Sequence, residues 1–194
     1  MNSAKPEPKP EPKPEPTSDL AQQIADASLL RGTFTLRSGR TSTYYLDKYK
    51  FSTKPHILAK LAPILADTIA QIETQIGPIT RLAGAELGGI PLVTIASMQT
   101  GKPAIFIRNA KKDYGTAKQV EGDVHEGDVV IFIEDVATTG GQALEAVEIL
   151  KSMGATVPAI ISVIDRQEGA RENIEAAGVA FHALFTKHDL GVQD

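Results

Sequence analysis

Residues 129–141 read Val-Val-Ile-Phe-Ile-Glu-Asp-Val-Ala-Thr-Thr-Gly-Gly, and the other predictions are built around them. Five uninterrupted apolar residues, Val129 to Ile133, predict a strand that is buried on both faces. Because unpaired carboxylates are costly to bury, we expect Glu134 and Asp135 at the carboxyl end of this strand, where the chain emerges. The small residues that follow can bring backbone N–H groups close to an anion.

The segment after this loop has the apolar spacing of a helix, with Ala143, Leu144, Val147, Leu150 and Met153 on one face. The loop therefore leads into a helix N-terminus, which adds a partial positive charge. A phosphate would then lie beside two carboxylates that can accept hydrogen bonds from vicinal hydroxyls, and a sugar phosphate fits both. The alternative is an ordinary strand-to-helix turn with two solvated carboxylates.

The order of these features resembles the phosphoribosyl pyrophosphate signature of the type I phosphoribosyltransferases. In that signature a hydrophobic strand, two acids, one apolar residue and a Thr/Gly-rich loop follow one another. The resemblance is more specific than a lone glycine motif, because strand, acid pair, loop and helix must all occur in order.

Length and composition exclude several other classes. The 194 residues suit one domain, and the net charge of −4 offers no broad attraction to nucleic acid or to anionic lipid. There is no cysteine, so disulfides, thiol nucleophiles and cysteine metal sites are excluded, and the four histidines show no metal-ligand spacing. No apolar run approaches the roughly 20 residues that cross a bilayer. The Walker A and GxGxxG motifs of nucleotide-binding proteins are absent as well.

The first 17 residues are predicted to be a disordered tail. Lys5 to Pro16 alternate proline with lysine or glutamate, which favours an extended polyproline-II-like chain without a core. It lacks the apolar centre of a signal peptide, and a proline-rich ligand for a partner is the less favoured alternative. Residues 18–194 are then the folded domain.

Strands and helices alternate along this domain, which predicts an α/β fold with a mainly parallel sheet flanked by helices. The predicted helices cover residues 20–30, 57–72 (kinked at Pro63), 90–98, 142–153 and 170–177. The predicted strands cover residues 34–39, 42–47, 79–84, 103–107, 129–133, 157–164 and 179–185. Ligands bind beyond the carboxyl ends of such strands, so the loops after strands 79–84, 103–107, 129–133 and 157–164 should converge on one site.

Residues 108–128 contain almost no apolar periodicity, and such a long loop predicts a functional lid, mainly over residues 108–122. Arg108, Lys111 and Lys112 offer cations to a polyanion such as pyrophosphate, and Gly115 offers a hinge. The alternative is a solvated charged loop.

Further motifs narrow the resemblance to the orotate phosphoribosyltransferases. They are the segments 34–40 and 42–45, the turn 84–91, the lid, the acid-pair loop and the segment 164–169, which occur in that family's order. The resemblance implies a type I phosphoribosyltransferase fold with a small N-terminal hood over residues 18–50. It also implies transfer of ribose 5-phosphate from phosphoribosyl pyrophosphate to orotate, giving orotidine 5′-monophosphate and pyrophosphate in pyrimidine biosynthesis.

The resemblance also implies roles for individual residues. Lys112 and Asp135 match catalytic positions, and Arg37, Thr138 and Arg166 match positions that contact orotate. The positions that match phosphoribosyl pyrophosphate contacts are Arg108, Lys111, Lys112, Glu134, Asp135, Val136, Ala137, Thr138, Thr139, Gly140, Gly141 and Gln142. Arg166 could clamp the orotate carboxylate through two parallel hydrogen bonds, the alternative being a surface ion pair with Asp165 or Glu168.

Three departures from the family pattern concern the lid and the turn. Asn109 stands where a lysine is common, Tyr114 where a histidine is common, and Gly88 where some members carry a basic residue. Lys111 could compensate for the missing charge.

The resemblance further implies Mg²⁺ bound mainly through phosphoribosyl pyrophosphate and pyrophosphate, with no protein metal site. It implies a cytoplasmic homodimer whose lid lysine serves the neighbouring subunit, and neither nucleic acid nor membrane as partner. Two alternatives remain at this point: a purine phosphoribosyltransferase, and a non-catalytic sensor of phosphoribosyl pyrophosphate.

Overall fold

The computed structural model describes residues 15–35, 39, 41–109 and 119–193. Its helices are α1 (Glu15–Ser28), α2 (Lys48–Ser52), α3 (Pro55–Ile76), α4 (Gly89–Thr100), α5 (Gly141–Ser152) and α6 (Ala170–Ala176). Its strands are β1 (Leu29–Thr35), β2 (Thr41–Leu46), β3 (Arg81–Ala85), β4 (Ala104–Ile107), β5 (Val120–Glu121), β6 (Val129–Ala137), β7 (Thr156–Asp165) and β8 (Ala180–Thr186).

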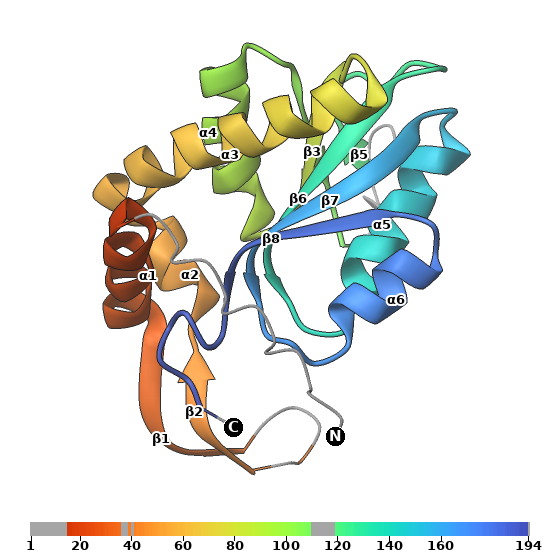
Figure 1. The fold of residues 1–194 in the computed structure, drawn as a ribbon. Helices are drawn as coiled ribbons and strands as arrows, with labels where there is room; N and C mark the ends of the chain where they lie inside the picture. The colour runs from red at the N-terminus through yellow and green to blue at the C-terminus, as the bar shows by residue number, and fades with distance from the viewer. Residues whose placement is uncertain (1–14, 36–38, 40, 110–118, 194) are drawn as a thin grey trace, which may run out of the picture.

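The central sheet has six strands in the order β5-β4-β3-β6-β7-β8 (Figure 1). β4, β3, β6, β7 and β8 are parallel, and only the short edge strand β5 is antiparallel to its neighbour β4. The continuous apolar segment predicted as the buried strand is β6, at the centre of the sheet. The predicted fold class, an α/β fold with a mainly parallel sheet, is therefore confirmed.

Helices cover both faces of this sheet (Figure 1). α3 and α4 lie on one face, where alternate β6 side chains, Ile131 and Ile133, join a core with Leu61, Leu65 and Leu92. α5 and α6 lie on the other face, where Val130 and Phe132 of the same strand join a second core with Val147, Leu150 and Ile174. β6 is buried on both faces because it contributes to both cores, which explains its continuous apolar sequence.

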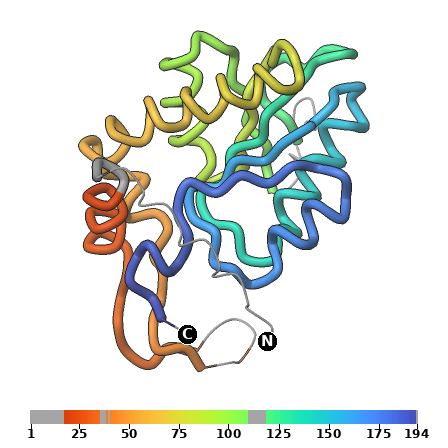
Figure 2. Tube along the Cα trace, viewed as in Figure 1, coloured from red at the N-terminus to blue at the C-terminus, as the bar shows by residue number. Residues whose placement is uncertain are grey.

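The hood consists of α1, the antiparallel pair β1–β2, and α2, and it lies beside the carboxyl ends of the central strands (Figure 1). Leu20 and Ile24 of α1 and Phe51 of α2 belong to the same core as α3 and α4, so the hood is packed onto the domain. The C-terminal segment returns to the hood (Figure 2), where the Arg31 guanidinium donates a hydrogen bond to the Gly191 carbonyl at 3.1 Å. The hood is thereby fixed close to the strand ends that carry the predicted site.

Three local predictions were wrong. The first helix ends at Ser28, and Leu29 already begins β1, because Leu29 pairs with Leu46 of β2. The segment 108–128 is not irregular throughout, since Val120 and Glu121 pair with Ile107 and Phe106. β6 continues to Ala137, beyond the predicted end at Ile133.

The boundary predicted at residue 17 stays a prediction, since residues 1–14 lie outside the described part of the chain; α1 begins at Glu15. None of the helices that the structure describes combines the length and the apolarity needed to cross a bilayer.

Candidate active site

The site lies where β6 loses one of its two neighbours. β3 pairs with β6 as far as Ile133, whereas β7 continues to pair with β6 as far as Ala137. The last residues of β6 are thus bonded on one side only, and the sheet opens at that point. The crevices beyond the carboxyl ends of parallel strands are where such folds bind ligands.

Glu134 and Asp135 lie within this half-paired end of β6, and both are buried, at 6% and 0% exposure. The expectation that they emerge with the chain was therefore wrong. Successive strand residues alternate in direction, so Glu134 lines the pocket beside α5 while Asp135 contacts Lys48 of the hood, although the two groups still interact with each other. Glu134 lies on the α5 side and Asp135 on the side of the hood and α4.

A pocket of about 170 Å³ lies on the Glu134 side. It is lined by Glu134, Val136, Ala137, Thr138, Thr139, Gly140, Gly141, Gln142 and Ala143. This is the predicted phosphate loop with the first turn of α5, so backbone N–H groups and the positive end of a helix dipole face the pocket. The pocket can hold an anion without any basic side chain in its lining.

The loop around this pocket is held by neighbouring elements. Gly140 has a φ of 79°, and a Cβ there would also contact the Ile174 side chain at 2.9 Å, so a larger residue does not fit. The Asn173 amide donates a hydrogen bond to the Thr139 carbonyl at 2.9 Å. The Ser162 hydroxyl accepts one from the Ala137 N–H at 3.1 Å. The loop is thus fixed before any ligand arrives, as expected for a preorganised anion site.

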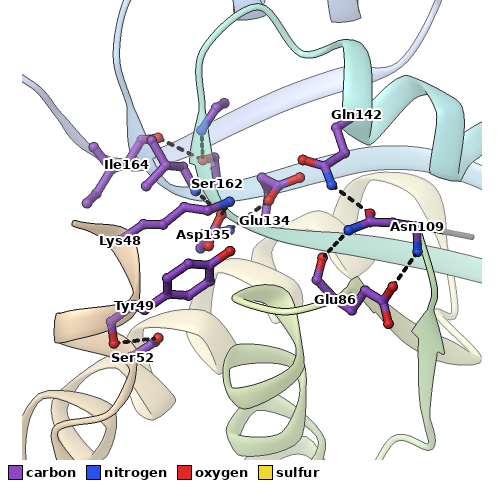
Figure 3. Close-up of polar contacts among 12 residues, drawn as sticks. Lys48, Tyr49, Ser52, Glu86, Asn109, Glu134, Asp135, Gln142, Ser162 and Ile164 are labelled. Atoms are coloured by element: carbon purple, nitrogen blue, oxygen red, sulfur yellow. Dashed lines mark hydrogen bonds and ion pairs between the residues drawn. The ribbon is translucent and has the colours of Figure 1, made fainter. Parts of the chain in front are cut away.

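Asp135 faces the hood, where Lys48 is its partner (Figure 3). The Lys48 ammonium lies 3.1 Å from Asp135 Oδ1, and the Val136 N–H donates to the same oxygen at 2.7 Å. The other oxygen, Oδ2, is buried without a hydrogen-bond partner in the described residues. It lies against Gly88, where an added Cβ would overlap the carboxylate. Any side chain at position 88, such as the basic residue that Gly88 replaces in the family pattern, would therefore displace Asp135 or the turn.

Burial and charge shift the pKa values of this cluster. Burial, followed by the hydrogen bond and charge of Asp135, raises the pKa of Glu134 well above its ordinary value of 4.5. Burial lowers the pKa of Lys48, but the charge and hydrogen bond of Asp135 outweigh it, so the net pKa lies above 10.5. Lys48 is therefore an ammonium at neutral pH, and the site pairs it with the buried Asp135 carboxylate.

A second set of hydrogen bonds joins the loops after β3 and β4 to the first turn of α5 (Figure 3). The Glu86 carboxylate, after β3, accepts from the Asn109 N–H at 2.8 Å. The Asn109 side chain, after β4, donates to the Glu86 carbonyl at 3.4 Å and accepts from the Gln142 amide at 2.8 Å. Asn109, which departs from the family pattern, thus connects the turn after β3 with the first turn of α5. The turn also contains a cis peptide bond between Glu86 and Leu87.

Arg166, directly after β7, lies against the hood rather than in the lining of the 170 Å³ pocket. Its guanidinium stacks on the Tyr44 ring at 5.5 Å, donates to the Tyr44 hydroxyl at 3.3 Å, and pairs with Glu168 at 2.8 Å. The ion pair with Glu168 was the sequence alternative, and it is present. Among the described residues the buried Nε of Arg166 has no hydrogen-bond partner, so the guanidinium keeps a donor for a ligand.

The remaining predicted cations are only partly described. Arg108 lies at the end of β4 with its side chain 37% exposed and 3.8 Å from the Glu121 carboxylate. Arg37, Lys111 and Lys112 lie outside the described residues, as does Tyr114. The structure therefore brings together Glu134 and the residues from Val136 to Gln142, with Asp135 and Arg166 at their hood side.

Unpartnered polar atoms gather in the predicted site residues. In the described part of the chain, five buried side-chain nitrogen or oxygen atoms have no hydrogen-bond partner. Three of them belong to Arg108, Asp135 and Arg166. Because such atoms are costly when left unpaired, their concentration here marks a site that a polar ligand completes.

No group of three His, Cys, Asp or Glu side chains able to hold a metal ion occurs among the described residues. Mg²⁺ characteristically keeps several waters and is bound by one or two carboxylates together with substrate phosphates. Glu134, at the wall of the phosphate pocket, suits that arrangement. The residues present therefore fit a Mg²⁺ ion that a phosphorylated substrate brings with it.

A larger pocket of about 480 Å³ lies elsewhere, between residues 119–125 and the end of α5. It includes Asp123 and His125 but neither the acid pair nor a helix N-terminus. The smaller pocket has the convergent polar groups that define a ligand site, so we assign the chemistry there.

The sequence prediction missed Lys48, Tyr44, Glu86 and Ser162. Lys48 and Tyr44 come from the hood. Their partners, Asp135 and Arg166, lie 87 and 122 positions further along the chain, so no local sequence pattern predicts these contacts. Ser162 carried a weak signal, since it is a lone hydroxyl within the apolar run from Ala159 to Ile164.

Comparisons with known proteins agree with this geometry. No family model matches the chain. A relative from Natronomonas pharaonis, named orotate phosphoribosyltransferase, is 42% identical over 173 residues, which cover 89% of this chain and 95% of the relative. The orotate phosphoribosyltransferase of Mycobacterium tuberculosis H37Rv, solved with Fe(III) dicitrate, superposes with a TM-score of 0.79 at 30% identity, covering 91% of this chain and 99% of that one.

The same Mycobacterium tuberculosis enzyme has been solved in complex with 5-phospho-α-D-ribosyl 1-diphosphate. That structure superposes with a TM-score of 0.75 at 29% identity, again covering 91% of this chain and 99% of that one. Sequence identity above 40% over most of both chains, together with the shared fold, is sufficient for assignment. This chain belongs to the orotate phosphoribosyltransferase family.

Proposed function

We propose that this protein transfers the ribose 5-phosphate group of phosphoribosyl pyrophosphate to orotate, giving orotidine 5′-monophosphate and pyrophosphate. The observation that carries the proposal is the position of a buried acid pair beside an amide-lined pocket of about 170 Å³ at the end of β6. The pocket suits a phosphate and the acids suit the hydroxyls of the attached ribose.

Ribose 5-phosphate binding falls to the loop and to Glu134. The N–H groups from Thr138 to Gln142 and the start of α5 would hold the 5-phosphate. Glu134, which also lines the pocket, would accept hydrogen bonds from the ribose hydroxyls. Because the loop is already held by Asn173 and Ser162, binding requires little reorganisation of it.

Catalysis in such a site relies on positioning and electrostatics. As the bond from C1 to pyrophosphate breaks, the ribosyl group becomes cationic, and the negative charge of the acid pair stabilises it. Orotate is itself anionic, so a strong general base is hardly required. Glu134 would help to hold a Mg²⁺ ion, and that ion would supply positive charge to neutralise the leaving pyrophosphate.

Orotate recognition would fall to Arg166. The orotate carboxylate can accept from the guanidinium, whose Nε has no partner in the part of the chain that the structure describes, while Tyr44 and Glu168 hold the guanidinium plane. Hypoxanthine and adenine lack this carboxylate, and so does uracil. A site built on Arg166 therefore favours orotate over all three.

The test is pyrophosphate release with phosphoribosyl pyrophosphate, Mg²⁺ and each base in turn. We expect release with orotate, and at least about 100-fold less with uracil, since a charge-assisted pair contributes about 1.5–3 kcal/mol per hydrogen bond. Release with a purine instead would indicate the purine phosphoribosyltransferase alternative. No release with any base, despite binding of phosphoribosyl pyrophosphate, would indicate a sensor.

The proposal includes a Mg²⁺-dependent homodimer in the cytoplasm. The lid cations Lys111 and Lys112 would bind the diphosphate, with Lys112 supplied to the neighbouring subunit. The family membership supports these features, and a test of lid sharing is given below.

A further inference from the structure

Lys48 is a charged residue of the site to which the sequence prediction gave no role. It is the first residue of α2, at the base of the hood, and its ammonium lies 3.1 Å from Asp135 Oδ1 (Figure 3). Its side chain is 32% exposed, whereas the Asp135 side chain is not exposed at all. The pair thus joins the hood to the buried end of β6.

The two oxygens of Asp135 have different surroundings. Oδ1 is held by the Lys48 ammonium and by the Val136 N–H. Oδ2 is buried against Gly88 and has no hydrogen-bond partner in the described residues. The orientation of the carboxylate therefore depends on Oδ1, and the strong, charged contact at Oδ1 comes from Lys48.

Removing the ammonium would leave a carboxylate with no exposed surface and a single backbone donor. A buried carboxylate without a compensating charge is unstable in that position, so it would rotate out of place. That rotation moves the carboxylate away from its place at the end of β6, where the proposed reaction generates a cationic sugar.

We propose that Lys48 is a positioning residue that holds the Asp135 carboxylate in its orientation in the active site. The inference rests on the proposed function and goes beyond it by assigning a hood residue to the ribose side of the site. Lys48 acts through Asp135, so its contribution should disappear when Asp135 is no longer a carboxylate.

A double-mutant cycle between Lys48 and Asp135 tests this. We expect Lys48→Met to lower kcat/KM for phosphoribosyl pyrophosphate about 10-fold or more, and Lys48→Arg to retain activity within about 3-fold, because arginine keeps the charge. In the Asp135→Asn background, Lys48→Met should change kcat/KM by less than about 2-fold. The matched control is Lys50→Met in the same helix, since Lys50 is half exposed and lies 4.0 Å from Asp47; its activity should stay within about 2-fold of the wild type.

Thermal unfolding shows which variants are folded. If Lys48→Met does not fold, Lys48→Gln takes its place in the double-mutant cycle. If Lys48→Met lowers kcat/KM by the same factor in the Asp135→Asn background as in the wild type, the inference is overturned, because Lys48 then acts independently of Asp135. Unchanged kinetics of Lys48→Met would overturn it as well. An inactive wild type, by contrast, would overturn the proposed function itself.

Discussion

Asp135 has no exposed surface, yet it lies at the end of a strand beside the proposed ribose site. Its charge is compensated by Lys48, and its second oxygen has room only because residue 88 is glycine. The sequence pattern predicted a role for the acid pair, and that role stays a prediction. The pattern could not predict that Glu134 and Asp135 lie buried within the strand, because that depends on β6 extending to Ala137 along β7.

At the scale of this one residue, we predict that Asp135→Asn lowers kcat about 100-fold, the order of effect seen when one preorganised electrostatic contact is removed. The amide has the same shape and still accepts from the Val136 N–H, so the fold should persist. Steady-state kinetics and circular dichroism spectra of the purified variant check both statements. Wild-type kinetics would show that the charge of Asp135 takes no part in the reaction.

The strands and helices were easier to predict from the sequence than the contacts between loops. Pattern alone predicted the parallel strands and every described helix except the short α2, since apolar periodicity reports directly on which faces are buried. It missed β5, because two residues are too few to show a period, although Val120 is 5% exposed and pairs with Ile107. It also missed the contacts between loops, which depend on tertiary packing.

Asn109 permits a prediction at this scale, since it connects the turn at Glu86 with Gln142 of α5. Asn109→Ala should raise KM for phosphoribosyl pyrophosphate about 5-fold with little change in kcat, as expected for one hydrogen bond of about 1 kcal/mol that holds the loop. Gln142→Ala removes the same bond from its other side. The double variant should therefore be no worse than the more impaired of the two single variants, and additive losses would contradict the link.

Asp128, which precedes β6 at the opposite end from the site, provides a stability prediction. Burial raises its pKa, but hydrogen bonds from the His125 N–H, Arg81 and Thr80 outweigh this, so the net pKa lies below its ordinary value of 3.8. Asp128→Asn should lower the free energy of unfolding by about 2 kcal/mol at pH 7, because Arg81 loses its charged partner at 2.6 Å.

The pH dependence of that difference follows from the direction of the shift. Because the pKa of Asp128 is lowered in the folded state, its carboxylate stabilises the protein above pH 3.8. This contribution is lost as the pH falls through the folded-state pKa. Urea unfolding of the wild type and of Asp128→Asn at pH 7, 4 and 3 measures this. The difference between their free energies of unfolding should shrink toward low pH. A gap that is constant with pH would mean that Asp128 is not stabilised as an anion, and KM should be unchanged throughout.

The whole molecule, as proposed, is a dimer with lids exchanged between subunits. We predict that mixing inactive Lys112→Ala with inactive Asp135→Asn, after subunit exchange, restores about a quarter of wild-type activity. Half of the dimers are then mixed, and each mixed dimer contains one intact site. If each lid serves its own subunit, no mixed dimer has an intact site and no activity returns.

The central claim is that the half-paired end of β6 and the loop after it bind ribose 5-phosphate. The most direct measurement is a crystal structure of this protein with phosphoribosyl pyrophosphate and Mg²⁺. The account predicts the 5-phosphate within hydrogen-bonding distance of the N–H groups between Thr138 and Gln142, with the ribose beside Glu134. A phosphate bound instead in the larger pocket beside β5, with this loop empty, would contradict it.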